Sequence, residues 1–289
     1  MKYTYYPGCS LEGSAKEYDR ATRSIMAALD VSLIDIPDWT CCGATAARAF
    51  DSLLSLALPA RNLALAQSVE DNPDILVPCS ACYLNLKDVK EKIRGDAELK
   101  ARLNTVLQDE DVQLENPPRV RHLLDVLARD ITAAALEKAR RHSLEGLSIA
   151  PYYGCQCLRP YAEFDDPEEP RSMEALINAT GARVHPWKMG GQCCGAGHMN
   201  TKPEVGMQLV APILEAARGA AAIATVCPMC QINLEGFQKR ISRQTGRKYN
   251  ITILYLPQLL GLALGLSGQE LGLGLNLALT REFKNRIAA

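Results

Sequence analysis

The chain has 289 residues, of which 47 % are hydrophobic and 11 are cysteine, and its formal net charge is −1. This length allows one large or two medium domains, and the apolar content suffices for an ordinary core without cysteine cross-links. A charge so close to zero gives no electrostatic reason to expect binding to nucleic acid or to an anionic membrane.

The N-terminus and the apolar stretches predict a cytoplasmic protein. Residues 1–8 contain no apolar core of the length found in signal peptides. The longest apolar stretch, residues 251–264, contains Pro257 and Gln258 and is too short to span a bilayer. Thiols stay reduced in the cytoplasm, so many cysteines at motif spacing indicate metal binding rather than disulfides.

The first half of the chain is predicted to alternate helices and short strands. Apolar spacing indicates helices near residues 21–29 and 61–69, strands at 31–36 and 75–77, and a charged, mostly helical region at 89–130. The second strand leads directly into a cysteine motif, which places that motif in a loop between a strand and a helix.

The second half repeats this order. Helices are expected at residues 172–179 and 211–218, and extended segments at 182–184 and 222–226. The segment 164–171, rich in acids and proline, is expected to be a solvated surface loop.

The repeated order of strand, cysteine loop and helix is a βα pattern. Such patterns favour parallel sheets with the cysteines at the carboxyl ends of the strands. The predicted fold is therefore α/β, with two tandem domains at residues 1–145 and 146–289. Each domain is expected to be a small, mostly parallel sheet with flanking helices, and a pseudo-twofold axis is expected to relate the two and turn both cysteine sets toward a shared cleft.

Internal duplication is visible directly in the residues. Tyr5-Tyr6-Pro7-Gly8-Cys9 recurs as Tyr152-Tyr153-Gly154-Cys155, Cys41-Cys42-Gly43-Ala44 as Cys193-Cys194-Gly195-Ala196, and the CxxC motif Cys79 to Cys82 as Cys227 to Cys230. The offsets between the copies are 146, 152 and 148 residues, which are nearly constant. Asn85-Leu86 and Asn233-Leu234 follow the two CxxC motifs at the same step, and residues 122–127 resemble residues 258–263.

Ten of the eleven cysteines fall into two sets, which are Cys9, Cys41, Cys42, Cys79, Cys82 and Cys155, Cys193, Cys194, Cys227, Cys230. A CxxC pair presents two thiolates from one turn and is a common unit of zinc and iron–sulfur sites. A helix that begins at the second cysteine would point N–H groups at the sulfurs and lower their pKa.

A four-cysteine zinc site in each half is the structural alternative. Zinc takes four ligands, whereas each half offers five, including an adjacent pair that chelates one ion awkwardly but reaches different irons of a cluster. The glycine after each pair suggests that the backbone passes close to a bulky group. These features favour a cluster over zinc, and the three further cysteines per half argue against a CxxC dithiol of thioredoxin type.

The eleventh cysteine, Cys157, lies two residues after Cys155. The alignment of the repeats makes Cys155 the ligand. Cys157 is interpreted as a small buried residue in preference to a reserve ligand or a thiol that faces substrate.

The pattern Cys9…Cys41-Cys42-Gly43…Cys79-x-x-Cys82, repeated in the second half, resembles the duplicated CCG domain of the heterodisulfide reductase B subunit. The resemblance covers residues 6–264 and implies two non-cubane [4Fe–4S] clusters, one on each five-cysteine set, with a substrate disulfide between them. In methanogen enzymes that substrate is the mixed disulfide of coenzyme M and coenzyme B. One departure is that 31 residues separate Gly195 from Cys227, against 35 between Gly43 and Cys79.

The resemblance therefore implies a catalytic iron–sulfur subunit that reduces a disulfide to two thiols or catalyses the reverse. The chain has no GxGxxG fingerprint and no separate ferredoxin-like cysteine run, so its electrons must come from elsewhere. The family implies a small C-type, ferredoxin-like subunit and an A-type flavoprotein. The alternatives are an electron-transfer subunit of a quinone-linked dehydrogenase of the succinate, lactate or glycolate type, and a zinc-binding module without turnover.

Five other residues near the cysteine loops are of interest. His198 is the candidate proton donor, because histidine titrates near neutrality, although a structural role is an equal alternative. Lys188 and Arg159 could hold an anionic thiol but are expected to be ordinary surface cations. His185 and Trp187 are expected to be packing residues.

Overall fold

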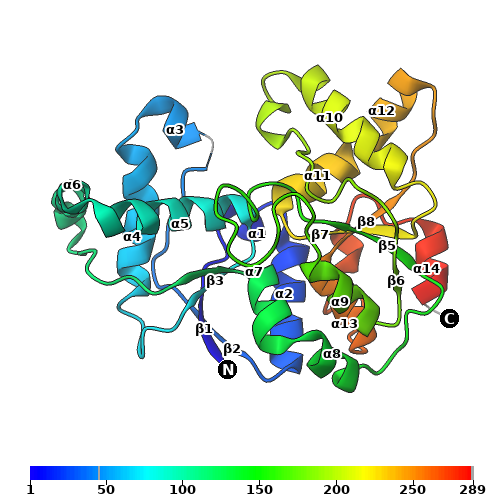
Figure 1. Ribbon diagram of the computed structural model, residues 1–289, viewed down its shortest axis with the longest axis horizontal. Helices are drawn as coiled ribbons and strands as arrows, with labels where there is room; N and C mark the ends of the chain where they lie inside the picture. Colours follow the sequence, from blue (N-terminus) through cyan, green and yellow to red (C-terminus); the bar gives the residue numbers. More distant parts are fainter. Residues whose placement is uncertain (45, 288–289) are drawn as a thin grey trace.

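The computed structural model describes residues 1–44 and 46–287 and contains two parallel four-stranded sheets (Figure 1). The first sheet has the order β2-β1-β3-β4, with β1 (Lys2–Tyr5), β2 (Ser32–Asp35), β3 (Ile75–Val77) and β4 (Val120–His122). The second has the order β6-β5-β7-β8, with β5 (Ser148–Tyr152), β6 (Arg183–Val184), β7 (Ala222–Thr225) and β8 (Thr252–Tyr255). The predicted α/β class with a duplicated parallel sheet is confirmed.

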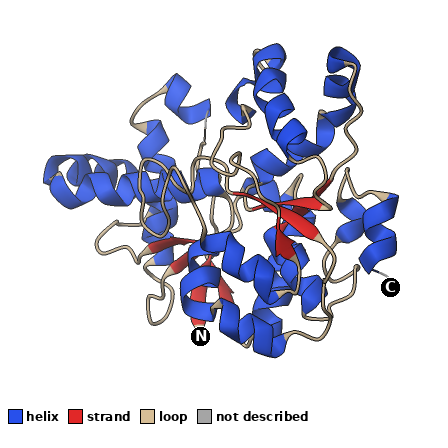
Figure 2. Cartoon of the chain, turned by 45° about the vertical axis from the view of Figure 1, so that its right-hand side comes forward, coloured by secondary structure: helices blue, strands red, loops and turns tan. Residues whose placement is uncertain are grey.

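Helices connect and cover the strands of each sheet (Figure 2). The first half contains α1 (Cys9–Glu12), α2 (Lys16–Ala28), α3 (Ala46–Phe50), α4 (Leu54–Ala66), α5 (Ser80–Gly95), α6 (Ala97–Leu107), the 3₁₀ turn η1 (Gln108–Glu110), α7 (Leu123–Val126), the π-helical turn η2 (Leu127–Ile131) and α8 (Ala133–Ala139). The second half contains α9 (Ser172–Ala179), η3 (Ala196–His198), α10 (Pro203–Ala216), α11 (Pro228–Gly236), α12 (Gln238–Thr245), α13 (Leu256–Ala263), η4 (Leu273–Leu275) and α14 (Arg281–Ile287). Among the described residues no helix is both long and apolar enough to cross a bilayer. The predicted division between residues 145 and 146 lies in the loop between α8 and β5.

Several elements differ from the sequence prediction. Strand β3 and helix α9 have the predicted bounds, whereas α4 and α10 begin earlier and continue through Pro59 and Pro212. Strand β4 was missed because Arg121 stands in its middle, where the guanidinium is buried against the carboxylates of Asp125 and Asp130. Strand β8 was missed because α13 follows it without a break in the apolar pattern.

The register of the sheets corrects one part of the repeat alignment. Val77 of β3 pairs with His122 of β4, and Thr225 of β7 pairs with Tyr255 of β8. His122 is thus the counterpart of Tyr255, three residues earlier than the Gln258 suggested by the similar leucine runs. Both residues stand at the carboxyl end of the last strand and immediately before a helix.

The two halves exchange helix contacts across their interface. Helix α2 packs against α13, and α9 packs against α7 and η2, so that each half covers a helix of the other. Figure 1 shows these helices together in the lower middle of the molecule. Such an exchange is expected of two copies related by an approximate twofold axis.

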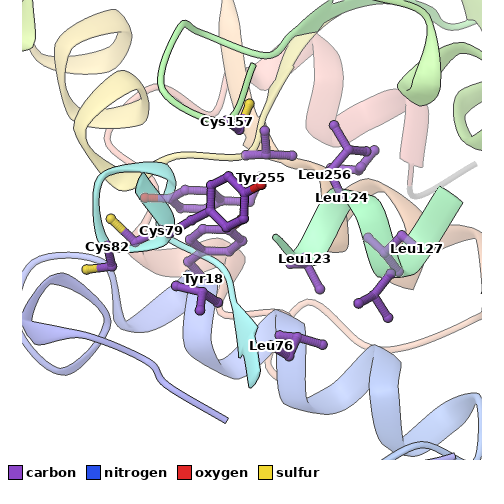
Figure 3. Packing of buried hydrophobic residues seen from close by; sticks show 14 of the residues in the cluster. Tyr18, Leu76, Cys79, Cys82, Leu123, Leu124, Leu127, Cys157, Tyr255 and Leu256 are labelled. Carbon is purple, nitrogen blue, oxygen red and sulfur yellow. The ribbon is translucent and has the colours of Figure 1, made fainter. Parts of the chain in front are cut away.

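Aromatic rings also stack across the interface between the two halves. Tyr18 of α2 stacks on Tyr255, with ring centroids 4.0 Å apart (Figure 3). Phe164, the counterpart of Tyr18 in the repeat, stacks on His122, with centroids 6.1 Å apart. One continuous hydrophobic core therefore extends through both halves, and the ends of β4 and β8 are held at fixed positions near the cysteine loops.

Candidate functional site

A single cavity of about 220 Å³ is lined by all ten cysteines of the two sets. Its other lining residues are Ser10, Ala44, Ser80, Ala81, Tyr153, Gln156, Ala196, Gly197 and Met229. The cavity lies beyond the carboxyl ends of the central strands of both sheets, where the strand order reverses, which is the usual ligand position in open parallel sheets. The predicted shared cleft is confirmed.

In the first set, the sulfurs lie in contacting pairs. The Sγ atoms of Cys9 and Cys41 are 3.5 Å apart, and those of Cys42 and Cys82 are 3.4 Å apart. Cys9 and Cys41 are exposed at the mouth, whereas Cys42, Cys79 and Cys82 are buried. The set therefore extends from solvent into the interior.

The second set repeats this arrangement. The Sγ atoms of Cys194 and Cys230 are 3.5 Å apart, and Cys155 and Cys193 lie close enough to shift each other's pKa. Cys193 is exposed, while Cys194, Cys227 and Cys230 are buried. Across residues 1–44 and 46–287, no three metal-binding side chains surround a position for a single metal ion.

The first cysteines of the two CxxC motifs meet across the interface. The thiols of Cys79 and Cys227, which come from different halves, both line the cavity and lie close enough to shift each other's pKa. The hydrogen bonds from Cys230 and Cys79, together with the N–H groups of Cys230 and Met229, hold the pKa of the Cys227 thiol well below its usual range. The two sets therefore approach each other at the buried CxxC cysteines of the cavity.

Each CxxC motif forms the first turn of a helix. Cys79 is the N-cap of α5 and Cys227 is the N-cap of α11, so each helix begins one residue after the first cysteine and not, as predicted, at the second. The free N–H groups of the first turn and the helix dipole favour negative charge at these sulfurs. The sequence thus places two helix N-termini against the same cavity.

Glycines before the first cysteine of each set allow close contact with sulfur. Gly8 and Gly154 have φ values of 73° and 72°, and a Cβ atom there would lie 2.8 Å from Sγ of Cys82 and 3.0 Å from Sγ of Cys230. A side chain at either position would therefore both strain the backbone and displace a cysteine.

The glycines after the adjacent cysteines have a different role from the one that the sequence suggested. Gly43 has a φ of 69°, and a Cβ atom there would lie 2.7 Å from Leu58 and 2.8 Å from Ala47. Gly195 has a φ of 68°, and a Cβ atom there would lie 2.9 Å from both Gly206 and Leu209. The bulky neighbours are helices of the protein itself, and not a group inside the cavity.

Two buried tyrosines fix the loops that carry the adjacent cysteines. The hydroxyl of Tyr6 donates to the carbonyl of Thr40 at 2.6 Å, and that of Tyr152 donates to the carbonyl of Gln192 at 2.7 Å. In each half the accepting carbonyl belongs to the residue just before the cysteine pair. Tyr6 and Tyr152, which precede Cys9 and Cys155 in the sequence, thus support the loop that carries the adjacent cysteine pair of the same half.

The family description "CCG: Cysteine-rich domain" matches residues 3–87 and 149–235. Each matched segment contains one complete five-cysteine set. This chain belongs to the CCG cysteine-rich domain family. It carries the CCG domain twice, in agreement with its two sheets and its two cysteine loop systems.

Three relatives are similar over nearly their whole length. The 8-methylmenaquinol:fumarate reductase membrane anchor subunit of Wolinella succinogenes is 33 % identical over 95 % of this chain and 96 % of the relative. The B subunit of a ferredoxin/F(420)H(2)-dependent CoB-CoM heterodisulfide reductase from Methanosarcina acetivorans is 30 % identical over 99 % of this chain and 97 % of its own. A protein from Archaeoglobus profundus, named as similar to the heterodisulfide reductase B subunit, is 28 % identical over 93 % of both chains.

A crystal structure of a hypothetical protein from Helicobacter pylori has the same fold. The TM-score is 0.77 at 15 % sequence identity, over 97 % of this chain and 52 % of the other. The same fold thus occurs as about half of a longer chain.

The two halves differ in which member of the adjacent cysteine pair has the lowered pKa. In the second domain, the interaction with Cys155, the N–H group of Gly195 and the nearby side chains of His198 and Arg159 lower the pKa of Cys193 to about 6. In the first, hydrogen bonds from Cys41 and Cys82 lower the pKa of Cys42 to about 4.

The predicted site residues outside the cysteines do not line the cavity. His198 is exposed at the end of η3, close to Cys193, and does not line the cavity. Arg159 donates to the carbonyl of Gly191 at 3.3 Å and pairs with Glu168 at 3.3 Å, which ties the acidic loop to the second cysteine loop. Lys188 lines a separate surface groove.

His185 and Trp187 are packing residues, in agreement with the sequence interpretation. The ring of His185 lies between the hydroxyl of Ser148 at 3.3 Å and the carbonyl of Ala216 at 3.2 Å. The indole of Trp187 donates to the carbonyl of Pro151 at 3.1 Å.

Cys157 is buried behind the cavity. Its Sγ donates to the carbonyl of Tyr153 at 3.2 Å, and burial raises the pKa of the thiol to about 12. It does not line the cavity, which agrees with the interpretation of a small buried residue.

Sequence reasoning missed the pair Ser80 and His122. The hydroxyl of Ser80, which lines the cavity, lies 3.2 Å from Nε2 of His122 and donates to the carbonyl of Val226 at 3.2 Å. The N–H of Leu124 donates to Nδ1 of His122, so Nε2 carries the proton and faces Ser80. Ser80 and His122 are 42 positions apart and lie in different elements, so no sequence pattern connects them.

Proposed function

We propose that this chain is the catalytic iron–sulfur subunit of a heterodisulfide reductase-like complex, which reduces a disulfide to two thiols or catalyses the reverse. The observation that carries this proposal is that both five-cysteine sets line one cavity. Two duplicated sites that open onto one space suit a substrate with two bonded sulfur atoms, one for each site. The similarity to proteins named as heterodisulfide reductase B subunits, over 97 % of one such relative, supports the same function.

Each set is proposed to hold one [4Fe–4S] cluster of the non-cubane type. The donors fit, because each half offers five thiols and thiolate sulfur is the usual protein ligand of iron–sulfur clusters. When bound, the two clusters supply the two electrons that cleavage of an S–S bond requires. The first set is Cys9, Cys41, Cys42, Cys79 and Cys82, and the second is Cys155, Cys193, Cys194, Cys227 and Cys230.

The chain itself supplies charge stabilisation, position and protons. The N-termini of α5 and α11 stabilise negative charge at the inner cysteines. The shared cavity keeps the two sets close enough to act on one disulfide. Cleavage consumes two electrons and two protons and yields two thiols, and His198 at the rim is the proposed proton donor.

Electrons are proposed to enter from partner subunits at the mouth of the cavity. The outer sulfurs of Cys9, Cys41 and Cys193 are exposed there, whereas the inner ones are buried. A ferredoxin-like C-type subunit, with an A-type flavoprotein behind it, is the proposed source. The relative whose name begins "Ferredoxin:CoB-CoM heterodisulfide reductase", which is 28 % identical over 99 % of this chain, is consistent with such a donor.

The second candidate is an electron-transfer subunit of a quinone-linked reductase. It is favoured by the 33 % identity to the subunit of an 8-methylmenaquinol:fumarate reductase. In that function the cysteine sets would relay electrons and no disulfide would enter the cavity.

Anaerobic assays with a chemical electron donor distinguish the two candidates. The purified chain, loaded with iron and sulfide, is supplied with reduced viologen and the coenzyme M–coenzyme B disulfide or simple aliphatic disulfides. A disulfide reductase should release two thiols for each two electrons consumed. A protein that releases no thiol from any disulfide, but transfers electrons between viologen and a menaquinone analogue, would favour the relay.

A further inference from the structure

One side chain in each half contacts the second cysteine of the adjacent pair from the side of the CxxC helix. The Nδ2 of Asn85 donates to the carbonyl of Cys42 at 3.0 Å and lies 3.8 Å from its Sγ. The Nδ2 of Asn233 donates to the carbonyl of Cys194 at 3.1 Å and also lies 3.8 Å from its Sγ. The two asparagines are at equivalent positions of the repeat, three residues after Cys82 and Cys230.

The amide group can serve both acceptors at once. A side-chain amide has two N–H donors, so one proton can bind the carbonyl oxygen while the other points to the sulfur. Three residues along a helix return to the same face, and each asparagine is therefore on the side of its helix that carries the second cysteine of the CxxC motif. The helix that supplies two sulfurs of a set thus also supplies an N–H donor to a third.

A hydrogen bond to a ligand sulfur changes the energy of the two redox states unequally. Reduction adds negative charge to a cluster and its thiolates, and an N–H donor stabilises that charge. The effect grows as water is excluded, because the local dielectric is lower. Asn233 is buried, with 3 % of its surface exposed, whereas Asn85 is only half-buried.

We propose that Asn85 and Asn233 are positioning residues whose N–H···S hydrogen bonds to Cys42 and Cys194 raise the reduction potential of the cluster in each half. This inference rests on the proposed function, because it assumes that each five-cysteine set holds a cluster. Because Asn233 is more deeply buried than Asn85, the larger effect on the reduction potential is in the second half. The two clusters of one chain consequently have different potentials.

The chain provides a matched control in Asn62. Its side chain supports the first cysteine loop through the backbone, accepting from the N–H of Thr40 at 2.8 Å and donating to the carbonyl of Thr40 at 2.9 Å. It is completely buried but, unlike Asn85, it has no hydrogen bond to a sulfur. Asn62→Leu therefore removes backbone support near the cysteines without removing an N–H···S bond.

The experiment measures iron, acid-labile sulfide and midpoint potentials in wild-type protein and in the variants Asn85→Leu, Asn233→Leu and Asn62→Leu. Potentials come from anaerobic titrations followed by EPR. Asn85→Leu and Asn233→Leu should each lower the potential of the cluster in their own half and leave the other unchanged, with the larger shift for Asn233→Leu. Unchanged potentials in both variants, or an equal shift in Asn62→Leu, would overturn the inference.

A second measurement applies if a leucine variant fails to retain its cluster. Wild-type protein labelled with ¹⁵N in the asparagine side chains should show a weak ¹⁵N coupling to the reduced clusters in pulsed EPR. No such coupling would also refute the inference. Wild-type protein without iron and sulfide would instead refute the proposed function, so the two failures are distinguishable.

Discussion

The ring of Tyr18 lies flat on the ring of Tyr255, with centroids 4.0 Å apart and planes inclined by 6°. The hydroxyl of Tyr18 donates to the carbonyl of Pro78 at 3.0 Å, one residue before the first CxxC cysteine. The side chain of Tyr18, in the first half, thus contacts both the end of β8 in the second half and the loop that carries Cys79. The interface between the halves and the position of Cys79 are consequently coupled.

Replacing Tyr18 should therefore lower the stability of both halves together and not of one half alone. Tyr18→Ala removes a completely buried aromatic ring and should lower the free energy of unfolding by about 3–5 kcal/mol, whereas Tyr18→Phe should cost about 1 kcal/mol. Urea unfolding of the anaerobic protein measures both. Tyr249→Phe, which removes a hydroxyl bound to Glu215 away from the interface, is the control. A cost below about 1 kcal/mol for Tyr18→Ala would show that the stack does not hold the halves together.

A methyl group at Gly154 should remove the cluster of the second half. Gly154→Ala would place Cβ 3.0 Å from Sγ of Cys230 at a φ of 72°. Gly219→Ala is the matched control, since Gly219 has a φ of 89° and no atom within 4 Å of the added Cβ. Iron determination should give about half the wild-type iron for Gly154→Ala and the full amount for Gly219→Ala. Full iron in Gly154→Ala would contradict the prediction, and an equal loss of iron in Gly219→Ala would show that backbone strain and not sulfur contact decides the outcome.

Cys157 should be dispensable for cluster binding. Cys157→Ser should retain the iron content and nearly full activity, because the side chain lies behind the cavity and bonds to the carbonyl of Tyr153. Cys155→Ser should lose iron from the second set. Loss of iron in Cys157→Ser together with full iron in Cys155→Ser would mean that the repeats had been aligned on the wrong cysteine.

Glu235 should make the stability of the protein depend on pH. Burial raises the pKa of this carboxyl from 4.5 to about 7, so the folded state favours the neutral form. The corresponding stabilisation is complete below pH 4.5 and is lost as the pH rises through about 7. Glu235→Gln is neutral at every pH and should exceed the wild type by about 3 kcal/mol at pH 8 and by little at pH 5. Denaturant titrations at both values test this, and a gap that is the same at pH 5 and pH 8 would contradict it.

Much of the site was predictable because cysteine is rare and the repeat is long. The positions of Cys79 and Cys227 after predicted strands place their sulfurs at the carboxyl edges of two parallel sheets, and this follows from the βα pattern. The strands β1 and β5, which precede Cys9 and Cys155, were not predicted. The shared cleft also followed, since two copies with equivalent sites can face each other. The sequence therefore located the lining of the cavity before its shape was known.

The parts that were not predictable depend on contacts between distant residues. From the sequence alone Arg121 is expected on the surface, and only the structure shows its ion pairs with Asp125 and Asp130. The strand β4, which contains Arg121, was therefore not predicted. The match of Asn85 and Asn233 was visible in the sequence, but only the structure shows that their amides contact Cys42 and Cys194. His122 was aligned with Gln258 because similar leucine runs follow both residues. The hydrophobic pattern alone does not fix the strand register, which makes Tyr255 the counterpart.

The central claim is that both cysteine sets act on one disulfide. Turnover of a disulfide by Cys42→Ala, Cys194→Ala and the double variant, with a chemical electron donor and with iron measured per chain, tests it most directly. If the two sets act as a unit, either single change should abolish nearly all turnover and the double change should add little. A Cys194→Ala protein that loses its second cluster and still cleaves the disulfide at a near-normal rate would contradict the account.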